Sequence, residues 1–255
     1  MNYIGIDIGS TATKLCIIEG ETGNDPRYQV FPTGWNSKIT SGSIREQIEK
    51  DLGNLDDTKI IATGYGRISV EYADKNVTEI TCHGLGGYTM AEGEDCSIID
   101  VGGQDTKFIN VQQGKVVDFL MNDKCAAGTG KFIEVMADRM GLTIEELFAL
   151  AKTGEVVPIS SLCTVFAESE VINYMGEGKK REDLAAGVID SVARKVANLV
   201  KRRSLLNKVI LTGGLSDNPY FAELLSAKLG HKVLPLEDGR FAGALGAALL
   251  ARRMQ

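Results

Sequence analysis

An internal repeat constrains the fold of this chain more than any other feature of its sequence. Residues 3–21 (YIGIDIGSTATKLCIIEGE) resemble residues 97–115 (SIIDVGGQDTKFINVQQGK). Each copy reads as an apolar strand, an aspartate (Asp7 or Asp100), a polar turn with glycine, a lysine and a second apolar strand. Two apolar strands joined by such a turn form a β-hairpin. The repeat therefore predicts two similar halves that face each other.

The segments between and after the hairpins predict an α/β protein. After the first hairpin we expect a loop rich in Gly, Pro, Asn and Ser over residues 20–43. The remaining pattern predicts helices over 44–52, 81–90, 132–140, from Thr143 onward, 165–175, 182–203, 219–229 and 241–251, and strands over 59–63 and 208–211. We expect the first half to span residues 1–95, completed by the C-terminal helix within 241–255, and the second half to span 96–240.

Composition argues against several classes of function. With 34 acidic and 28 basic residues the net charge is -6, so no broad basic surface for nucleic acid is expected. No apolar run is long enough to span a bilayer. The chain enters its first strand at Tyr3 without a basic leader, so we expect no signal peptide. The five cysteines suggest no disulfide framework, which predicts a reducing, cytoplasmic location.

One glycine-rich segment resembles a phosphate-binding P-loop but lacks two of its required residues. Residues 128–131 (GTGK) are similar to the end of the Walker A pattern G-x-x-x-x-G-K-S/T. Cys125 stands where the pattern requires its first glycine, and Phe132 stands where it requires Ser or Thr. Without that hydroxyl the loop has no side-chain ligand for Mg²⁺. We therefore reject a P-loop.

Three other motifs, taken in order, resemble the actin, hexokinase and Hsp70 phosphotransferase superfamily. DIGSTATK (7–14) is similar to its first phosphate loop, DVGGQDTK (100–107) to its second, and LTGGLSDN (211–218) to its adenosine motif. Each motif alone is weak evidence for the superfamily, because Asp and Gly at strand ends are ordinary turn residues in about half of cases. Together they imply a duplicated ribonuclease-H-like fold of the actin/hexokinase type, with a nucleotide cleft between the two halves.

The superfamily resemblance implies roles for these motifs in binding ATP and Mg²⁺. Asp7 and Asp100 would hold hydrated Mg²⁺ across the cleft, and Gln104 would orient an attacking water. Hydroxyl, backbone N–H and ammonium groups of the first loop would contact phosphate, and the glycine pair of the third motif would let adenosine lie on the backbone. The expected cofactor-binding residues are Ser10, Thr11, Ala12, Thr13, Lys14, Gly102, Gly103, Asp105, Gly213, Gly214 and Gly243.

Two cysteines stand where the sequence pattern predicts helix starts. Cys125 opens the segment CAAGTGKFIEVMADRM, and Cys163 opens CTVFAESEVINYM. The N-terminus of a helix carries partial positive charge and free N–H donors, which favour a thiolate and any anion that it holds. An ATP-binding fold with two cysteines in this setting suggests that ATP is coupled to a redox centre.

The other cysteines predict structural roles. Cys16 and Cys96 lie in or at the start of apolar strands and are expected to be buried core thiols. Cys82 and His83 are adjacent, and adjacent residues point to different faces of a helix or strand. A structural role is therefore favoured over metal binding for this pair. The roles of Cys82 and His83, and of the single Trp35, are left open.

Further segments resemble one branch of this superfamily. NDKCAAGTGKF (122–132), SSLCTVFAESEVI (160–172) and ATGYGR (62–67) are similar to signature segments of the BadF/BadG/BcrA/BcrD ATPase family. That family includes the ATP-dependent activators of 2-hydroxyacyl-CoA dehydratases, in which two identical subunits share one [4Fe-4S] cluster and each supplies two thiolates. The resemblance implies a homodimer with Cys125 and Cys163 as the metal ligands. It also implies ATP-driven electron transfer from a ferredoxin or flavodoxin to a separate iron–sulfur dehydratase.

Two other hypotheses stay open at this point. A small-molecule kinase, for example of a sugar, would need a carboxylate base near the second phosphate loop, and Asp105 is available. Such a kinase would not need the two cysteines, and no sugar-binding insertion is evident. The chain could also be a regulatory protein that binds ATP without turnover. The sequence does not identify the acyl-CoA, the dehydratase or the electron donor.

Overall fold

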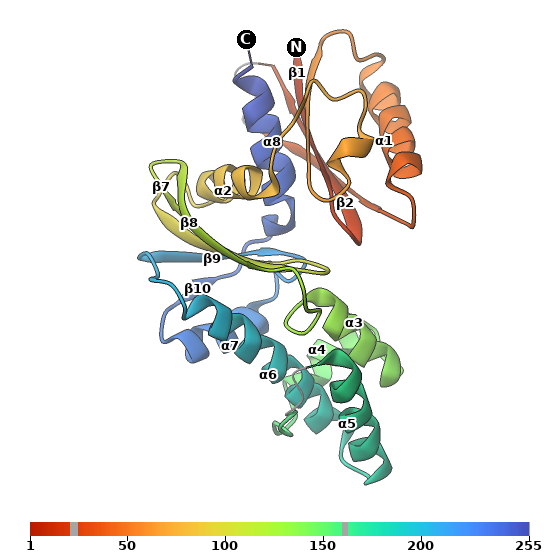
Figure 1. Ribbon diagram of the computed structural model, residues 1–255, viewed down its shortest axis with the longest axis vertical. Coiled ribbons are helices and arrows are strands. Elements are labelled where there is room, and N and C mark those ends of the chain that lie inside the picture. The colour runs from red at the N-terminus through yellow and green to blue at the C-terminus, as the bar shows by residue number, and fades with distance from the viewer. Residues whose placement is uncertain (21–24, 160–162, 255) are drawn as a thin grey trace.

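The chain folds into two five-stranded mixed sheets, one built on each copy of the repeat (Figure 1). The computed structural model describes residues 1–20, 25–159 and 163–254. The first sheet has the order β3-β2-β1-β4-β5 and consists of β1 (Asn2–Ile8), β2 (Ala12–Glu19), β3 (Arg27–Pro32), β4 (Thr58–Thr63) and β5 (Lys75–Asn76). The second has the order β10-β9-β6-β7-β8 and consists of β6 (Cys96–Val101), β7 (Thr106–Gln112), β8 (Lys115–Asn122), β9 (Lys208–Gly213) and β10 (Val233–Leu234).

The two sheets share one topology. Strand β1 pairs antiparallel with β2 and parallel with β4, and β6 pairs in the same way with β7 and β9. The hairpin registers are also equivalent, since Asp7 lies opposite Lys14 and Asp100 lies opposite Lys107. The structure therefore confirms the two hairpins that the repeat predicts and the duplicated α/β fold.

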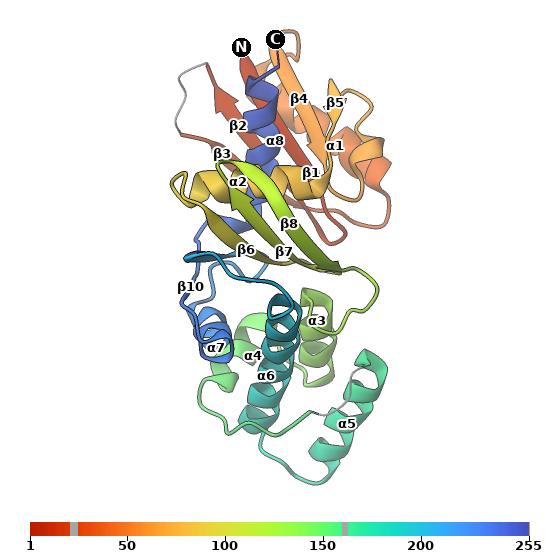
Figure 2. The same cartoon turned by 60° about the vertical axis from the view of Figure 1, so that its left-hand side comes forward.

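Helices cover both faces of each sheet. They are α1 (Ser37–Leu52), α2 (Glu79–Met90), α3 (Gly130–Arg139), α4 (Ile144–Ala151), α5 (Thr164–Gly176), α6 (Arg181–Val200), α7 (Pro219–Leu229) and α8 (Ala242–Arg252), with short 3₁₀ turns η1 (Arg67–Ser69) and η2 (Gly239–Phe241). Helix α1 packs on one face of the first sheet and α8 on the other. Helices α2 and α8 lie between the two sheets, and α3 to α7 lie beyond the second sheet (Figures 1 and 2). Among the described helices, none has both the length and the apolar character needed to cross a membrane.

The prediction of a loop over residues 20–43 was wrong in its second part. Strand β3 occupies Arg27–Pro32 and α1 begins at Ser37, whereas residues 21–24 lie outside the described part of the chain. The helix starts early because Asn36 caps it: the Asn36 side-chain oxygen accepts hydrogen bonds from the backbone N–H of Lys38 at 2.9 Å and of Ile39. A side-chain cap of this kind satisfies N–H groups that have no partner within the helix.

Close contact between α2 and α8 holds the centre of the molecule together. A Cβ atom on Gly86 of α2 would lie 1.8 Å from the carbonyl oxygen of Ala242, and one on Gly246 of α8 would lie 1.8 Å from that of Cys82. Only glycine permits backbones to approach this closely. Helix α8 also contacts β1 and β4 of the first sheet. The division of the chain at residue 95, with residues 241–255 returning to the first half, stays a prediction.

Candidate functional site

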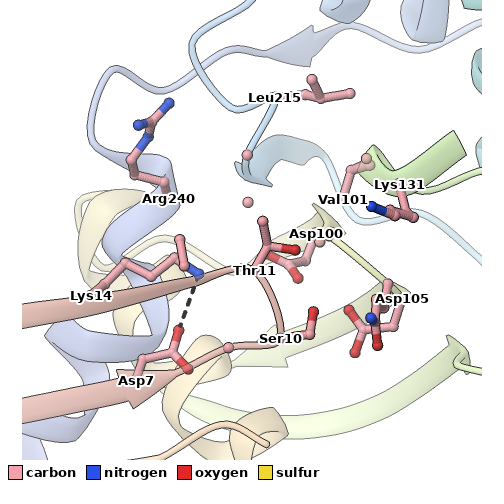
Figure 3. A pocket seen from close by; sticks show the side chains of 18 of the residues that line it. Asp7, Ser10, Thr11, Lys14, Asp100, Val101, Asp105, Lys131, Leu215 and Arg240 are labelled. Atoms are coloured by element: carbon pink, nitrogen blue, oxygen red, sulfur yellow. Dashed lines mark ion pairs between the residues drawn. The ribbon is translucent and has the colours of Figure 1, made fainter. Parts of the chain in front are cut away.

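A cavity of about 390 Å³ lies between the two sheets, at the tips of both hairpins (Figure 3). Most residues predicted to bind nucleotide or act on it line this cavity: Asp7, Ser10, Thr11, Ala12, Lys14, Asp100, Gly102, Gly103, Gln104, Asp105, Gly213 and Gly214. Thr13 does not line it; its buried hydroxyl lies 2.9 Å from the hydroxyl of Thr33. Gly243 does not line it either and lies in α8, where a Cβ would be 2.8 Å from Asp7 Oδ2. The structure thus gathers the three predicted motifs around one cleft.

The two hairpin tips have the same turn and approach each other. In the first, the N–H of Gly9 donates to the carbonyl of Ala12 at 3.2 Å. In the second, the N–H of Gly102 donates to the carbonyl of Asp105 at 2.9 Å. A Cβ on Gly103 would lie 2.4 Å from the hydroxyl oxygen of Thr11, which is part of the opposite tip. Polar groups from both copies of the repeat therefore converge on the same small volume.

Asp100 is a buried carboxylate with several partners. Thr212 donates its hydroxyl to Asp100 Oδ1 at 2.8 Å, and Lys107 Nζ lies 3.2 Å from Oδ2. Burial alone would raise the pKa of Asp100, but the nearby charges of His83 and Lys107 and the hydrogen bonds hold it well below its usual value. Asp100 is therefore ionised near neutral pH, as a group that interacts with a cation must be.

Lys107 is the cation at the centre of the second hairpin. Its side chain is 1% exposed, and Nζ lies 2.7 Å from Asp105 Oδ1 and 2.9 Å from Glu79 Oε1. Burial lowers the pKa of Lys107, but Asp100, Glu79 and Asp105 together raise it above its usual value. This ammonium group is therefore a fixed charge of the cleft and binds three carboxylates at once.

Asp7 occupies the equivalent place in the first hairpin but has weaker partners. Lys14 Nζ lies 3.8 Å from Asp7 Oδ2, and this lysine is partly open to the cleft (Figure 3). His83 Nε2 lies at the same 3.8 Å from that oxygen. A Cβ on Gly243 would lie 2.8 Å from Asp7 Oδ2 and 2.7 Å from His83 Nε2. Glycine is therefore required at this position for α8 to pack against these two side chains. Lys14 is thus more exposed and less closely paired than Lys107.

Sequence reasoning missed three residues of this site. Lys107 is equivalent to Lys14 in the repeat, and this equivalence could have predicted that Lys107 also belongs to the site. Glu79 and His83 both line the cleft, and their spacing of four on a helix places them on one face. Cys82 points instead into the core against α8, so the expectation that Cys82 and His83 face different ways is confirmed. Trp35 is 89% exposed and contributes nothing to the cleft.

The two predicted metal-ligating cysteines are exposed, whereas the other three cysteines are buried. Cys163 is the N-cap residue of α5, as predicted. Cys125 does not begin a helix: the segment 126–129 forms a turn, closed by a hydrogen bond from the N–H of Thr129 to the carbonyl of Ala126, and α3 starts only at Gly130. A positive φ at Gly128 interrupts the helical path. Residues 160–162 of the segment around Cys163 lie outside the described residues.

Both cysteines neighbour the same ammonium group, that of Lys195 on α6. Partial burial lowers the pKa of Lys195, and interactions with Cys125 and Cys163 oppose that shift. The side chain of Lys195 also lies against the backbone of the Cys125 segment, because a Cβ on Gly128 would be 3.1 Å from its Cβ.

Direct hydrogen bonds connect the Cys125 segment to the second hairpin tip. The N–H groups of Gly130 and Lys131 donate to the carbonyls of Gly102 and Gly103 at 2.9 and 2.8 Å. The buried hydroxyl of Thr106 donates to the carbonyl of Gly128 at 2.7 Å. The start of α3 and the turn that follows Asp100 are therefore one connected unit.

Comparison with known proteins places this arrangement in a family. The sequence pattern of the BadF/BadG/BcrA/BcrD ATPase family matches residues 4–251. The chain belongs to this family of ATPases. It is 40% identical over 251 residues to the (R)-2-hydroxyglutaryl-CoA dehydratase activating ATPase of Acidaminococcus fermentans, covering 97% of this chain and 96% of that protein.

Solved structures of two such activators superimpose on this ATPase family member. The crystal structure of Acidaminococcus fermentans (R)-2-hydroxyglutaryl-CoA dehydratase component A gives a TM-score of 0.91 at 37% identity, covering 99% of this chain and 98% of that one. The activator of the 2-hydroxyisocaproyl-CoA dehydratase from Clostridium difficile, with bound ADPNP, gives 0.88 at 38% identity, covering 99% and 95%.

More distant neighbours share only the fold. A ROK family glucokinase from Streptomyces griseus gives a TM-score of 0.59 at 16% identity, covering 100% of both chains. This likeness confirms the predicted actin/hexokinase-type architecture and says nothing further about activity.

Proposed function

We propose that this ATPase is an activator that uses ATP hydrolysis to pass a low-potential electron to a separate dehydratase of the 2-hydroxyacyl-CoA type. One observation supports the proposal above all. The turn that follows Asp100, in a cleft of ATP-binding type, is hydrogen-bonded to the segment that bears the exposed Cys125. A change at the phosphates therefore has a short, hydrogen-bonded path to the segment of this cysteine. The names of the close relatives supply the class of partner.

In this proposal the chain binds ATP with Mg²⁺ across the cleft. The hydroxyls of Ser10 and Thr11 and the Lys14 ammonium would contact phosphate oxygens. Asp7 and Asp100 would hold Mg²⁺ through its water molecules, because Mg²⁺ gives up its hydration shell reluctantly. Gln104 would orient the attacking water, and Gly213 and Gly214 would lie beneath adenosine. The net negative charge of the buried groups supports a cation between them and the phosphates.

Cys125 and Cys163 would hold a [4Fe-4S] cluster shared by two copies of the chain. A cluster of this type takes four thiolates, so two exposed cysteines per chain fit the donor set of a twofold dimer. When bound, such a cluster supplies one-electron chemistry. Val165 and Phe166, two and three residues after Cys163, are 65% and 68% exposed, and exposed apolar side chains support a protein contact here. A ferredoxin or flavodoxin as donor and a cytoplasmic location complete the proposal.

Anoxic purification and iron analysis test this proposal. We expect about four iron and four sulfide per dimer in the wild type. Cys125→Ala and Cys163→Ala should each lose the iron and still bind ATP. Cys96→Ala is the matched control, because this thiol is buried in the core and should keep the iron. Full iron content in the Cys125→Ala or Cys163→Ala protein, or a colourless wild type after anoxic reconstitution, would refute the assignment.

A kinase of the same superfamily is the alternative function. Its candidate base, Asp105, lines the cleft, but Asp105 Oδ1 lies only 2.7 Å from Lys107 Nζ. Lys107 therefore occupies one of the two oxygens that could accept a proton from a substrate hydroxyl. ADP release that depends on an added sugar or similar alcohol, with a phosphorylated product, would favour the kinase over the activator.

A further inference from the structure

His83 stands between the two halves of the cleft with no hydrogen bond of its own. Its side chain is 5% exposed, and it projects from α2 between two equivalent positions of the repeat, Asp7 and Asp100. Within the described part of the chain, neither ring nitrogen of His83 makes a hydrogen bond, and neither does Asp7 Oδ1. A buried polar atom without a partner is destabilising, because it has lost its hydrogen bonds to water. Nε2 of His83 and Asp7 Oδ1 therefore indicate a function other than packing, whereas Nδ1 lies 3.3 Å from Asp100 Oδ1.

The two ring nitrogens of His83 have different neighbours. Nδ1 lies 3.3 Å from Asp100 Oδ1, whereas Nε2 lies 3.6 Å from Glu79 Oε1 and 3.8 Å from Asp7 Oδ2. With the proton on Nδ1 directed at Asp100, the lone pair of Nε2 faces the other two carboxylates. Metal-binding histidines commonly have this arrangement, in which a carboxylate orients the ring from behind.

The donor atoms are also close enough to share one ion. One ligand atom each from Asp7, Glu79 and His83 all lie within 4.8 Å of one another. Two carboxylate oxygens and one imidazole nitrogen form a donor set that suits divalent first-row transition metals. Mg²⁺, by contrast, prefers oxygen ligands and water.

The balance of charge favours a dication at this point. Lys14 and Lys107 are the ammonium groups that pair with the cluster, and its carboxylates are Asp7, Glu79, Asp100 and Asp105. Four carboxylates and two ammonium groups leave a formal charge of about -2 when His83 is neutral. This excess of buried negative charge attracts a dication.

We propose that Asp7, Glu79 and the Nε2 atom of His83 bind a divalent transition metal ion directly, with Asp100 orienting the imidazole from Nδ1. The site is distinct from a hydrated Mg²⁺ held with ATP, although both would use Asp7. It requires no nucleotide, no iron–sulfur cluster and no partner, so it does not depend on the proposed electron transfer.

Titration of the full-length, nucleotide-free protein with Mn²⁺ tests the site. Mn²⁺ is the suitable probe because it is paramagnetic and binds thiolates poorly, so Cys125 and Cys163 do not compete. We expect one bound Mn²⁺ per chain by electron paramagnetic resonance (EPR), with ¹⁴N coupling from imidazole in the pulsed spectrum. We also expect wild-type protein to prefer Mn²⁺ over Mg²⁺ by at least about tenfold.

Variants separate the ligands from the rest of the cleft. His83→Gln should lose the ¹⁴N coupling and bind Mn²⁺ at least about tenfold more weakly. Glu79→Gln should weaken binding but keep the coupling, which shows that the ring is still a ligand. Glu134→Gln removes a carboxylate that lines the same cleft outside the cluster and should change neither quantity. Thermal melting of each variant confirms that it is folded.

Two results would overturn the proposal. One is bound Mn²⁺ in the wild type without ¹⁴N coupling, and the other is equal Mn²⁺ affinity in the wild type and His83→Gln. Loss of iron in the Cys125→Ala protein bears only on the electron-transfer function. The two proposals can therefore fail separately.

Discussion

Replacing Lys107 by methionine should destabilise the native protein strongly. The side chain is 1% exposed, and its ammonium group lies 2.7, 2.9 and 3.2 Å from carboxylate oxygens of Asp105, Glu79 and Asp100. Methionine has similar bulk but no charge, so the variant leaves these carboxylates buried without their cation. Removing one partner of a buried ion pair typically costs about 3–5 kcal/mol. We expect Lys107→Met to lose stability in this range.

The loss should depend on pH in a defined direction. The folded-state pKa of Asp100 is held well below its usual value, partly by Lys107. A carboxyl group whose pKa is depressed by folding stabilises the protein fully above its unfolded-state pKa of about 3.9. This stabilisation disappears as the pH falls through the folded-state pKa. In Lys107→Met the carboxyl groups protonate at higher pH and no longer need a cation. The difference in the free energy of unfolding between wild type and Lys107→Met should therefore be largest at pH 7.5 and smaller at pH 5.

Urea unfolding in EDTA at both pH values measures the effect. Lys131→Met is the matched control, because Lys131 lines the same cleft but its pair with Glu134 is 45% and 40% exposed. An exposed pair of this kind contributes at most about 1 kcal/mol. If Lys107→Met loses no more stability than Lys131→Met, the buried ammonium does not hold the cleft together and our reasoning about it is wrong.

Three further predictions concern the cysteines and the α2–α8 contact. In protein without a cluster, Ellman's reagent should label Cys125 and Cys163 in the native state. It should label Cys16, Cys82 and Cys96 only after unfolding, because burial raises the pKa of these thiols to about 12, 12 and 11. A third thiol that reacts rapidly in the native state would contradict this. Lys195→Met should lower the reduction potential of a bound cluster by on the order of tens of millivolts, because a nearby positive charge favours the reduced form. An unchanged potential in a redox titration would show that the Lys195 charge does not act on the cluster. Gly86→Ala should cost at least about 1–3 kcal/mol in urea unfolding, because its Cβ would lie 1.8 Å from a carbonyl oxygen. Gly42→Ala, in α1 with nothing within 4 Å, should instead stabilise by up to about 1 kcal/mol, and equal effects would contradict the packing argument.

The sequence predicted the features that local pattern determines. The repeat was sufficient to predict both hairpins and two similar halves that face each other, and the superfamily resemblance added the prediction that Asp7 and Asp100 lie at one cleft. Strand β3 was missed because its side chains alternate only weakly between partly buried and exposed, so the segment lacks the period of a half-buried strand. The start of α1 was missed because a cap residue was taken for part of a loop.

The remaining site residues depend on tertiary structure. The spacing of Glu79 and His83 shows that they share a helix face, but no local signal says that this face lies between two aspartates from different sheets. That position follows from the contact between α2 and α8, which joins parts of the chain far apart in sequence. Likewise, the turn before α3 separates Cys125 from the helix start, because Gly128 adopts a positive φ.

The position of α8 has a consequence for the synthesis of the protein. One apolar face of the first sheet is completed by Ala244, Leu245, Ala247, Ala248 and Ala251, which leave the ribosome after both sheets. Translation proceeds at roughly 5–20 residues per second, so the strands β1, β2 and β4 wait on the order of ten seconds or more for their final layer. Nascent chains are therefore open to chaperones, or to aggregation, through this one surface. We expect the N-terminal part to become resistant to protease when α8 has emerged from the ribosome, rather than when the first sheet itself emerges.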